Sequence, residues 1–122
     1  MPANAPDSSN KSDSTDAETR LAKLKAEVAA FVAEKGFVDN PKDLSMSIAI
    51  ESAELMEQFQ WLTTEEAARV TKDPDLMDKI RTEFADVFIY CLGFANELGI
   101  DITSAVRRTL ATNRRRHWPH EK

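Results

Sequence analysis

The 122-residue chain has little cysteine, glycine or proline and no long run of apolar residues. Its single cysteine, Cys91, cannot pair within the chain, and the surrounding sequence DVFIYCLGFA favours a small buried thiol without a chemical role. No stretch is apolar over the roughly 20 residues that a membrane-spanning helix needs. No glycine-rich phosphate loop occurs. We therefore expect a helix-rich protein without a membrane partner.

The amino-terminal residues 1–14 also lack large apolar side chains, and Ser, Asp, Asn and Pro dominate them. Such a segment cannot offset the entropy of ordering, so we expect a flexible tail followed by one domain over residues 15–122. The tail has neither the apolar core of a secretion signal nor the arginine-rich amphipathic pattern of a transit peptide. The expected location is therefore cytoplasmic.

Charge is unevenly distributed along the chain, which carries a formal net charge of -5. An acidic balance argues against a dedicated nucleic-acid partner. Arginines nevertheless crowd the carboxyl-terminal region, at positions 107, 108, 114, 115 and 116. Cations near the end of a helix suit its dipole, so we interpret most of this cluster as a solvated helix end.

Capping signals and apolar spacing predict four long helices and one short one. The first is expected from a capping box at Thr15 and Glu18 to Gly36, and the second from Asp43 as N-cap to about Leu62. A further capping box, Thr63 with Glu66, predicts a short helix or turn.

The third long helix should begin with Asp73 and Pro74 and end at Gly99, and Asp101 should cap the last helix, over about 102–116. No alternation typical of strands competes with these helices. The expected class is all-α.

Two of these helices carry carboxylates on their apolar face. At 100° per residue, Leu44, Leu55 and Ile48 all fall within about 60° of Glu51, and Glu54 lies about 60° to one side. The third long helix repeats the arrangement, because apolar residues surround Glu83 in the same way and Asp86 lies on the same flank.

Four converging carboxylates need a positive partner, because an uncompensated buried carboxylate costs several kcal/mol. No basic residue occurs between Lys42 and Arg69, and the third long helix offers only Lys79 and Arg81. Oxygen ligands favour Mg²⁺, with Mn²⁺ as a substitute, over zinc. The alternative is that the helices are rotated so that the acids lie exposed at the rim of the core; their duplication on two helices favours the metal site.

Three stretches together resemble one known family: ESAELMEQFQWL, EFADVFIYCLGFANELGIDI and NRRRHWP. They are similar to the MazG-like nucleoside triphosphate pyrophosphohydrolases, an all-α superfamily that includes the deoxycytidine triphosphate pyrophosphatases. The resemblance covers about residues 37–119. It implies a four-helix MazG-like bundle completed by oligomerisation, as a homodimer or a dimer of dimers with active sites near subunit contacts. Apolar residues left over on the third long helix agree with such an assembly.

The resemblance also implies an activity and a site. It makes Glu51, Glu54, Glu83 and Asp86 the Mg²⁺ ligands and catalytic residues. The reaction would be the hydrolysis of a nucleoside triphosphate to a monophosphate and pyrophosphate, with a role in clearing unwanted nucleotides from the pool. One of the four carboxylates can serve as general base, and the residues leave open which one does.

Five further residues are expected to bind substrate. Trp61 and Tyr90 lie on the carboxylate flank of their helices and can bound a nucleoside, with core or interface packing as the alternative. Phe37 stands where some dCTP-handling members have tryptophan. Asn113 and Arg116 resemble polar residues of the family that contact phosphate or sugar, although RHWP replaces a shorter family motif, so Arg115 and Arg116 both remain candidates for that position.

Two other classes of protein are compatible with a helical bundle of this size. A di-iron carboxylate protein is disfavoured because it needs Glu-x-x-His on two helices, and no histidine lies in any expected helix. A catalytically silent interaction or regulatory module would keep the fold alone. The loss of carboxylates would favour this module, whereas all four are present here.

Overall fold

The computed structural model describes residues 15–121, and the expected tail over residues 1–14 lies outside them. No strand occurs in the described part of the chain, which confirms the all-α class. The elements in order are α1 (Leu21–Lys35), α2 (Pro41–Glu57), the short α3 (Thr64–Ala67), the 3-10 turn η3 (Val70–Lys72), α4 (Pro74–Leu98) and α5 (Ile102–Arg115). None of these helices is both long and apolar enough to cross a membrane.

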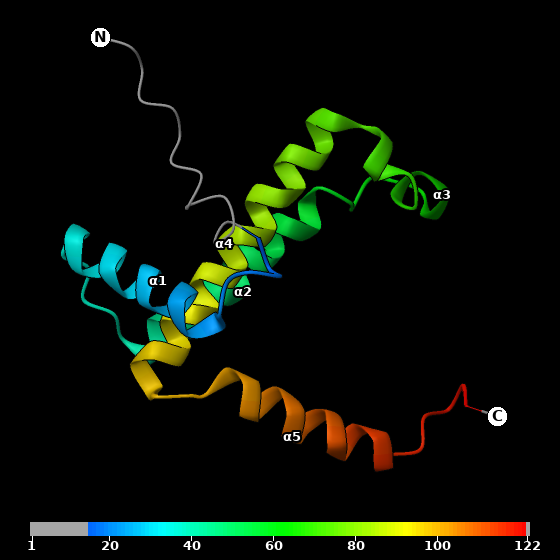
Figure 1. Ribbon diagram of the computed structural model, residues 1–122. Helices are drawn as coiled ribbons and strands as arrows, with labels where there is room; N and C mark the ends of the chain where they lie inside the picture. The colour runs from blue at the N-terminus through cyan, green and yellow to red at the C-terminus, as the bar shows by residue number, and fades with distance from the viewer. Residues whose placement is uncertain (1–14, 122) are drawn as a thin grey trace, which may run out of the picture.

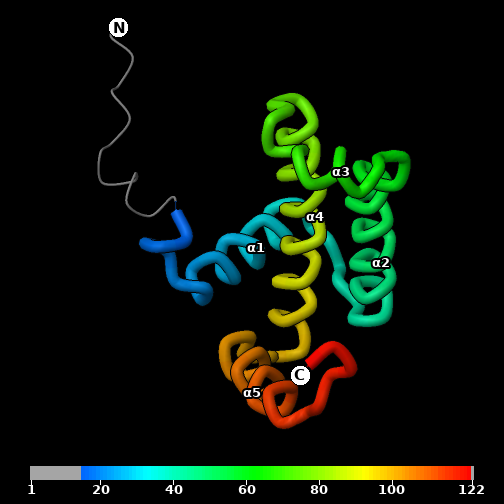
Figure 2. Tube along the Cα trace, turned by 90° about the vertical axis from the view of Figure 1, so that its right-hand side faces the viewer, coloured from blue at the N-terminus to red at the C-terminus, as the bar shows by residue number. Residues whose placement is uncertain are grey.

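Helix α4 is the central element, and both α1 and α2 pack against it (Figure 1). Figure 2 shows α1 and α2 on opposite sides of α4. Four apolar side chains are buried between these helices, and they belong to Val28 of α1, Leu44 of α2, and Leu92 and Ala95 of α4. The small core therefore follows α4 and lies toward its carboxyl-terminal half.

Most helix ends lie where the capping signals placed them. Gly36 and Gly99 end α1 and α4 with left-handed backbone at φ 68° and 64°, which glycine adopts without a steric penalty. Asp73 accepts a hydrogen bond from the Leu76 N–H at 3.1 Å, and Thr63 and Glu66 form the expected capping box. Asp101 caps α5 through the Ser104 N–H.

The expected start of the first helix was wrong. Residues 15–18 form a turn in which the N–H groups of Glu18 and Thr19 donate to the Thr15 carbonyl, and α1 begins only at Leu21. The segment before Leu21 has no large apolar side chain to pack on α4. A helical turn there would gain too little burial to offset its nucleation.

Both expected ends of the second helix were also wrong. Asn40, not Asp43, is the N-cap, and its side chain accepts from the Lys42 N–H at 2.9 Å while Pro41 occupies the first helical position. The helix ends at Glu57 instead of Leu62. The capping box explains the early end, because Thr63 must be extended to cap α3 and the chain needs the intervening turns to reach that conformation.

Helix α5 projects away from α2 and α4 in Figure 1. Its apolar residues Val106 and Leu110 are about half exposed within the single chain. No residue of α5 is buried. The packed part of the described chain thus consists mainly of α1, α2 and α4, and these three helices position the candidate site.

Candidate active site between α2 and α4

Carboxylates from α2 and α4 converge where the two helices run side by side. Oxygen atoms of Glu51, Glu83 and Asp86 all lie within 4.8 Å of one another, and all three residues are half-buried. The apolar spacing placed them there, since each lies on or beside the stripe that faces the other helix. Among residues 15–121 this carboxylate cluster is the one group with the geometry to hold a metal ion.

Glu54 lies at the edge of the cluster and is exposed. Its oxygen atoms fall outside the group that shares the 4.8 Å spacing. It still acts on the cluster, because both its charge and a side-chain hydrogen bond with it contribute to raising the pKa of Glu51 and of Glu83. The structure therefore brings three of the four expected ligands together and places the fourth beside them.

The electrostatics of the cluster are unfavourable to ionised carboxylates. Desolvation is the largest cause that raises the pKa of Glu51, followed by the neighbouring carboxylates Glu54, Asp86 and Glu83. Desolvation likewise raises the pKa of Glu83 first, followed by the charges of its acidic neighbours. For both groups, every contributing charge is negative.

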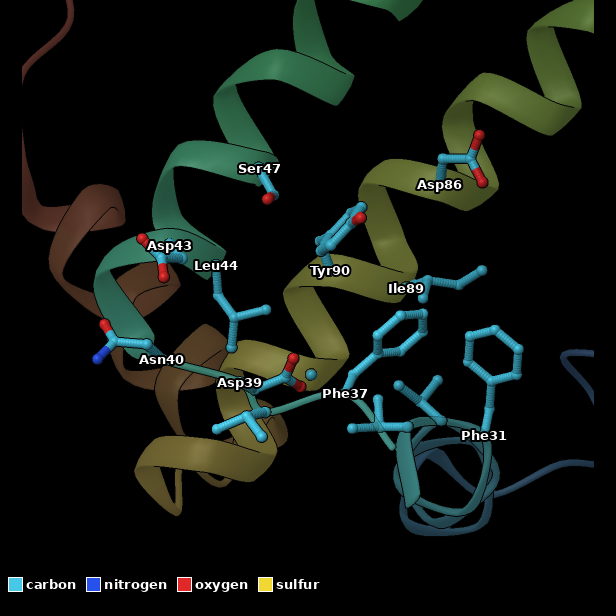
Figure 3. Close-up of a pocket in the computed structure, with 14 residues that line it drawn as sticks. Phe31, Phe37, Asp39, Asn40, Asp43, Leu44, Ser47, Asp86, Ile89 and Tyr90 are labelled. Carbon is cyan, nitrogen blue, oxygen red and sulfur yellow. The ribbon is translucent and has the colours of Figure 1, made fainter. Parts of the chain in front are cut away.

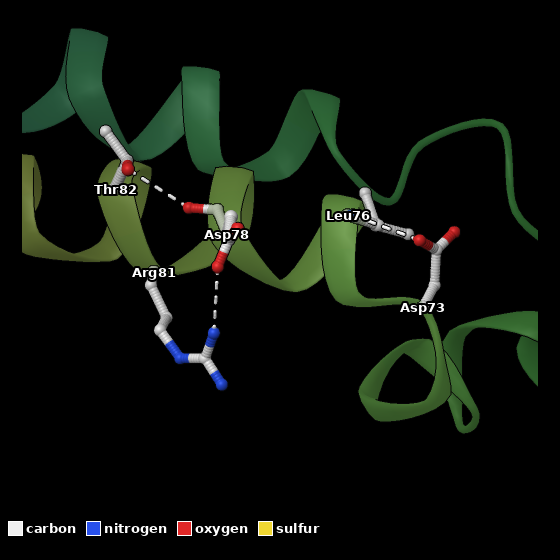
Figure 4. A network of polar contacts seen from close by, with 5 residues as sticks. All are labelled: Asp73, Leu76, Asp78, Arg81 and Thr82. Atoms are coloured by element: carbon white, nitrogen blue, oxygen red, sulfur yellow. Dashed lines mark hydrogen bonds and ion pairs between the residues drawn. The ribbon is translucent and has the colours of Figure 1, made fainter.

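No side chain of the described segment supplies the missing positive charge. Arg81, which is near in sequence, forms an exposed ion pair with Asp78 at 3.2 Å instead (Figure 4). The Oε2 atom of Glu83 is buried without a hydrogen-bond partner among residues 15–121. A carboxylate oxygen that is removed from water without a hydrogen-bond partner is unfavourable, so this atom is suited to a ligand.

A divalent cation fits this donor set. Mg²⁺ binds oxygen atoms at about 2.0–2.1 Å, so ligands on opposite sides of one ion lie about 4.2 Å apart. The spacing within 4.8 Å needs only a small movement of flexible glutamate side chains to reach that value. A bound cation would also satisfy Glu83 Oε2 and offset the repulsion. Ligation by these residues remains a prediction.

A pocket of about 410 Å³ adjoins the carboxylate cluster (Figure 3). This volume lies within the range of small-molecule sites. Asp86 belongs to both the pocket and the cluster. From there the pocket runs toward the α1–α2 loop, because Tyr90 lies one turn after Asp86 on α4 and Ser47 lies one turn before Glu51 on α2.

Aromatic and polar side chains divide the pocket wall between them. Phe31 and Phe37 form a tilted ring pair with centroids 6.1 Å apart, and both line the pocket. The polar wall includes Asp39 from the α1–α2 loop and Ser47 from α2. The structure therefore places Phe37 and Tyr90, two of the expected nucleoside-binding residues, around one cavity that contains Asp86.

The other expected substrate-binding residues lie elsewhere in this chain. Trp61 is 87% exposed in the segment after α2 and does not line the pocket. Asn113 lies in α5, where its carbonyl accepts a hydrogen bond from the Trp118 ring N–H, and the Arg116 guanidinium lies 4.7 Å from the centre of the Trp118 ring. Neither lines the pocket. The substrate-binding role of all three remains a prediction.

Several pocket residues were not expected from the sequence. Ser47 could have been found, because it lies four residues before Glu51 on the same face of α2. Phe31 was visible only as one of the apolar residues of the first helix. Asp39 had no such signal, because the path of the α1–α2 loop decides where its side chain lies.

The fold and site together define a class: an all-α protein in which two long helices hold a carboxylate cluster beside a pocket of small-molecule size. The model of the MazG-like family matches residues 46–122, which include most of α2, the carboxylate cluster and the whole of α4. The chain belongs to the MazG-like family.

Individual relatives agree with this assignment. The chain is 32% identical over 94 residues to dCTP pyrophosphatase 1 of Bos taurus, a match that covers 75% of this chain and 56% of that protein. The human dCTP pyrophosphatase 1 matches equally well, with 55% of its length covered. The chain thus spans about half the length of these relatives.

Two further relatives are covered more fully. A dATP/dGTP diphosphohydrolase of cyanophage S-2L is 34% identical over 98 residues, which cover 80% of this chain and 77% of that protein. The crystal structure of a pyrophosphatase from Archaeoglobus fulgidus superposes with a TM-score of 0.70 at 32% identity, covering 78% of this chain and 89% of that one. The resemblance stated from the sequence is therefore confirmed.

The strain in the carboxylate cluster predicts an unusual stabilising substitution. Glu83→Gln should raise the Tm of the metal-free protein at pH 7.5, because it removes one charge from a repelling group at nearly constant volume. The raised pKa of Glu83 means that the folded chain holds the proton more tightly than the unfolded chain. Ionisation therefore destabilises the fold as pH rises, and the gain in Tm should shrink at pH 4.5.

Thermal melting at both pH values measures this effect, with Glu97→Gln on the exposed end of α4 as the matched control. Added Mg²⁺ should raise the Tm of the wild-type protein more than that of the Glu83 variant. A variant that melts below the wild-type protein at pH 7.5 without metal would show that the carboxylates do not repel each other.

Proposed function

We propose that the protein hydrolyses nucleoside triphosphates or their deoxy forms to a monophosphate and pyrophosphate, with Mg²⁺ as cofactor and Mn²⁺ as a possible substitute. The observation that supports this most is the convergence of Glu51, Glu83 and Asp86, with an unpartnered Glu83 oxygen, at one end of a small-molecule pocket. Relatives named for dCTP and for dATP and dGTP hydrolysis support the same reaction class.

The chain's own residues divide the work along the pocket. Glu51, Glu83 and Asp86, with Glu54 beside them, would hold the cation, which supplies positive charge to the phosphates and Lewis-acid activation of the attacking water. A carboxylate at the edge of the cluster, less committed to the cation, can take the proton from that water. Glu54 fits that role by its exposed position, and the other three remain candidates.

The nucleoside would occupy the pocket beyond Asp86. Phe31, Phe37 and Tyr90 provide apolar and aromatic surface there, which suits the faces of a base. The names of the relatives include a pyrimidine and two purine nucleotides, so they do not single out one base. The biological role would be the removal of unwanted nucleotides from the pool, in the cytoplasm expected from the sequence.

A catalytically silent module with the same fold is the alternative. It would not need the carboxylates, and a core without them would be more stable. All four are retained, and three of them converge although they repel each other. Because the repulsion between these carboxylates destabilises the fold, their presence favours the enzyme over the silent module.

Pyrophosphate release from a panel of ribo- and deoxyribonucleoside triphosphates tests the proposal. We expect release from at least some of them with Mg²⁺ and none with a chelator. Glu83→Gln should lower kcat/KM by about 100-fold or more, because it removes a ligand charge, while the helical circular dichroism spectrum stays the same. Glu34→Gln, an exposed change on α1, should keep wild-type turnover.

Two results would contradict this proposal. Release that continues in the chelator or in the Glu83 variant would separate the activity from the carboxylate cluster. No release from any triphosphate by the folded protein would favour the silent module.

We also propose that the protein assembles as a homodimer or a dimer of dimers. The single chain buries only four apolar side chains among the described residues, and large ones remain exposed on all the long helices, including Ile50, Phe84 and Leu110. Such exposed apolar surface is typical of an interface between subunits. A partner would also give α5, which carries Asn113 and Arg116, something to pack against.

Size-exclusion chromatography with light scattering measures the assembly directly. The expected mass is two or four times the 13.7 kDa of one chain. Leu110→Asp on α5 should shift the protein toward smaller species, because it buries a charge in the interface. A monodisperse monomer of the wild-type chain would refute the assembly.

A further inference from the structure

The pocket has an acidic wall. Of the residues that line it, Asp39, Asp43 and Asp86 are acidic, and none is Lys, Arg or His. Such a wall repels phosphate, whereas a cation held at the carboxylate cluster attracts it. A nucleotide bound across both sites would therefore place its phosphates at the cluster and its uncharged base in the pocket.

Asp39 is the member of this wall that combines partial burial with a free carboxylate, since Asp43 is exposed and Asp86 belongs to the carboxylate cluster. It is half-buried, and among residues 15–121 its side chain has no hydrogen-bond or ion-pair partner. It is not needed as a helix cap, because Asn40 already caps α2 through the Lys42 N–H. The carboxylate thus remains available to a molecule in the pocket.

The Asp39 carboxylate lies beside the Gly93 turn of α4. A Cβ atom at position 93 would lie 4.0 Å from Asp39 Oδ2, an ordinary van der Waals distance, and Gly93 itself is buried. Figure 3 shows Asp39 between the start of α2 and α4, with Phe37 beyond it on the α1 side. This position lies at the end of the pocket away from Asp86.

An ionised carboxylate can only accept hydrogen bonds. Cytosine, adenine and guanine each present an amino group that donates, while uracil and hypoxanthine have an oxygen in place of the amino group of cytosine and of adenine, respectively. An oxygen facing Asp39 would leave two acceptors opposed and unpaired, which is strongly unfavourable in a partly dehydrated pocket.

We infer that the pocket selects nucleotides whose base carries an exocyclic amino group, and that Asp39 is the residue that makes this distinction. The inference rests on the proposed function, which places the phosphates at the carboxylate cluster. It adds the class of base that the substrate carries. Phe31 and Phe37 would contact the faces of the base, and Asp39 would read its edge.

The test compares pairs of nucleotides that differ only in the amino group. Turnover of dCTP against dUTP, and of dATP against dITP, gives the selectivity as a ratio of kcat/KM. Calorimetric binding of dCMP against dUMP, with Mg²⁺ present, gives the same comparison without catalysis. We expect the amino-bearing member to be favoured by about tenfold or more in both measurements.

Asp39→Asn tests the assigned residue, because an amide both donates and accepts. It should reduce the selectivity at least fivefold, chiefly through a gain for dUMP and dUTP, and Glu34→Gln should leave it unchanged. Melting of both variants verifies that they fold. The wild-type selectivity is informative even if the Asp39 variant does not fold.

The outcomes separate this inference from the proposed function. Hydrolysis without preference for the amino-bearing member would overturn the inference and leave the function intact. Selectivity that survives Asp39→Asn would overturn the role of Asp39. Selective binding of dCMP without hydrolysis of any triphosphate would support the pocket assignment and contradict the enzyme, and equal binding of dCMP and dUMP without hydrolysis would overturn both.

Discussion

Repulsion between carboxylates in a half-buried helix contact is the constraint on which the rest of the structure depends. Glu51 and Asp86 belong to helices that pack on each other to form the core, and both side chains are half-buried at that contact. Desolvation and mutual repulsion raise the pKa of Glu51 and Glu83. A bound divalent cation would offset this repulsion, because it binds carboxylate oxygens and supplies positive charge.

The pocket and the carboxylate cluster act as two ends of one site. Asp86 is shared between them, and the next turns of α2 and α4 continue the wall toward the α1–α2 loop. The cluster concentrates negative charge that needs a cation, while the pocket offers aromatic surface and an acceptor at Asp39. In the proposed function, the phosphates of a nucleotide would lie at the cluster and its base in the pocket.

Local signals in the sequence predicted much of the fold. Pro74, Gly99 and the capping box at Thr63 fix backbone conformation by themselves, so they set helix ends correctly. The signal at Thr15 failed because a cap without apolar residues behind it gains no packing. At α2, both Asn40 and Asp43 are residue types that cap helices, and Pro41 at the first helical position favours Asn40.

The candidate site was predictable to the extent that it lies on regular helices. Helical periodicity placed Glu51 and Glu83 on facing stripes, and their convergence follows once α2 packs on α4. The position of Asp39 depends on a loop, whose path no periodicity describes. Trp61 follows the end of α2, so the angle calculated for a continuous helix did not apply to it.

Anomalous diffraction from crystals grown with Mn²⁺ tests the central claim most directly. We predict an anomalous peak bounded by the carboxylate oxygens of Glu51, Glu83 and Asp86, with Glu83 Oε2 turned toward it. Ordered carboxylates with no peak between them at saturating Mn²⁺ would contradict the account, because the cluster would then not bind a divalent cation.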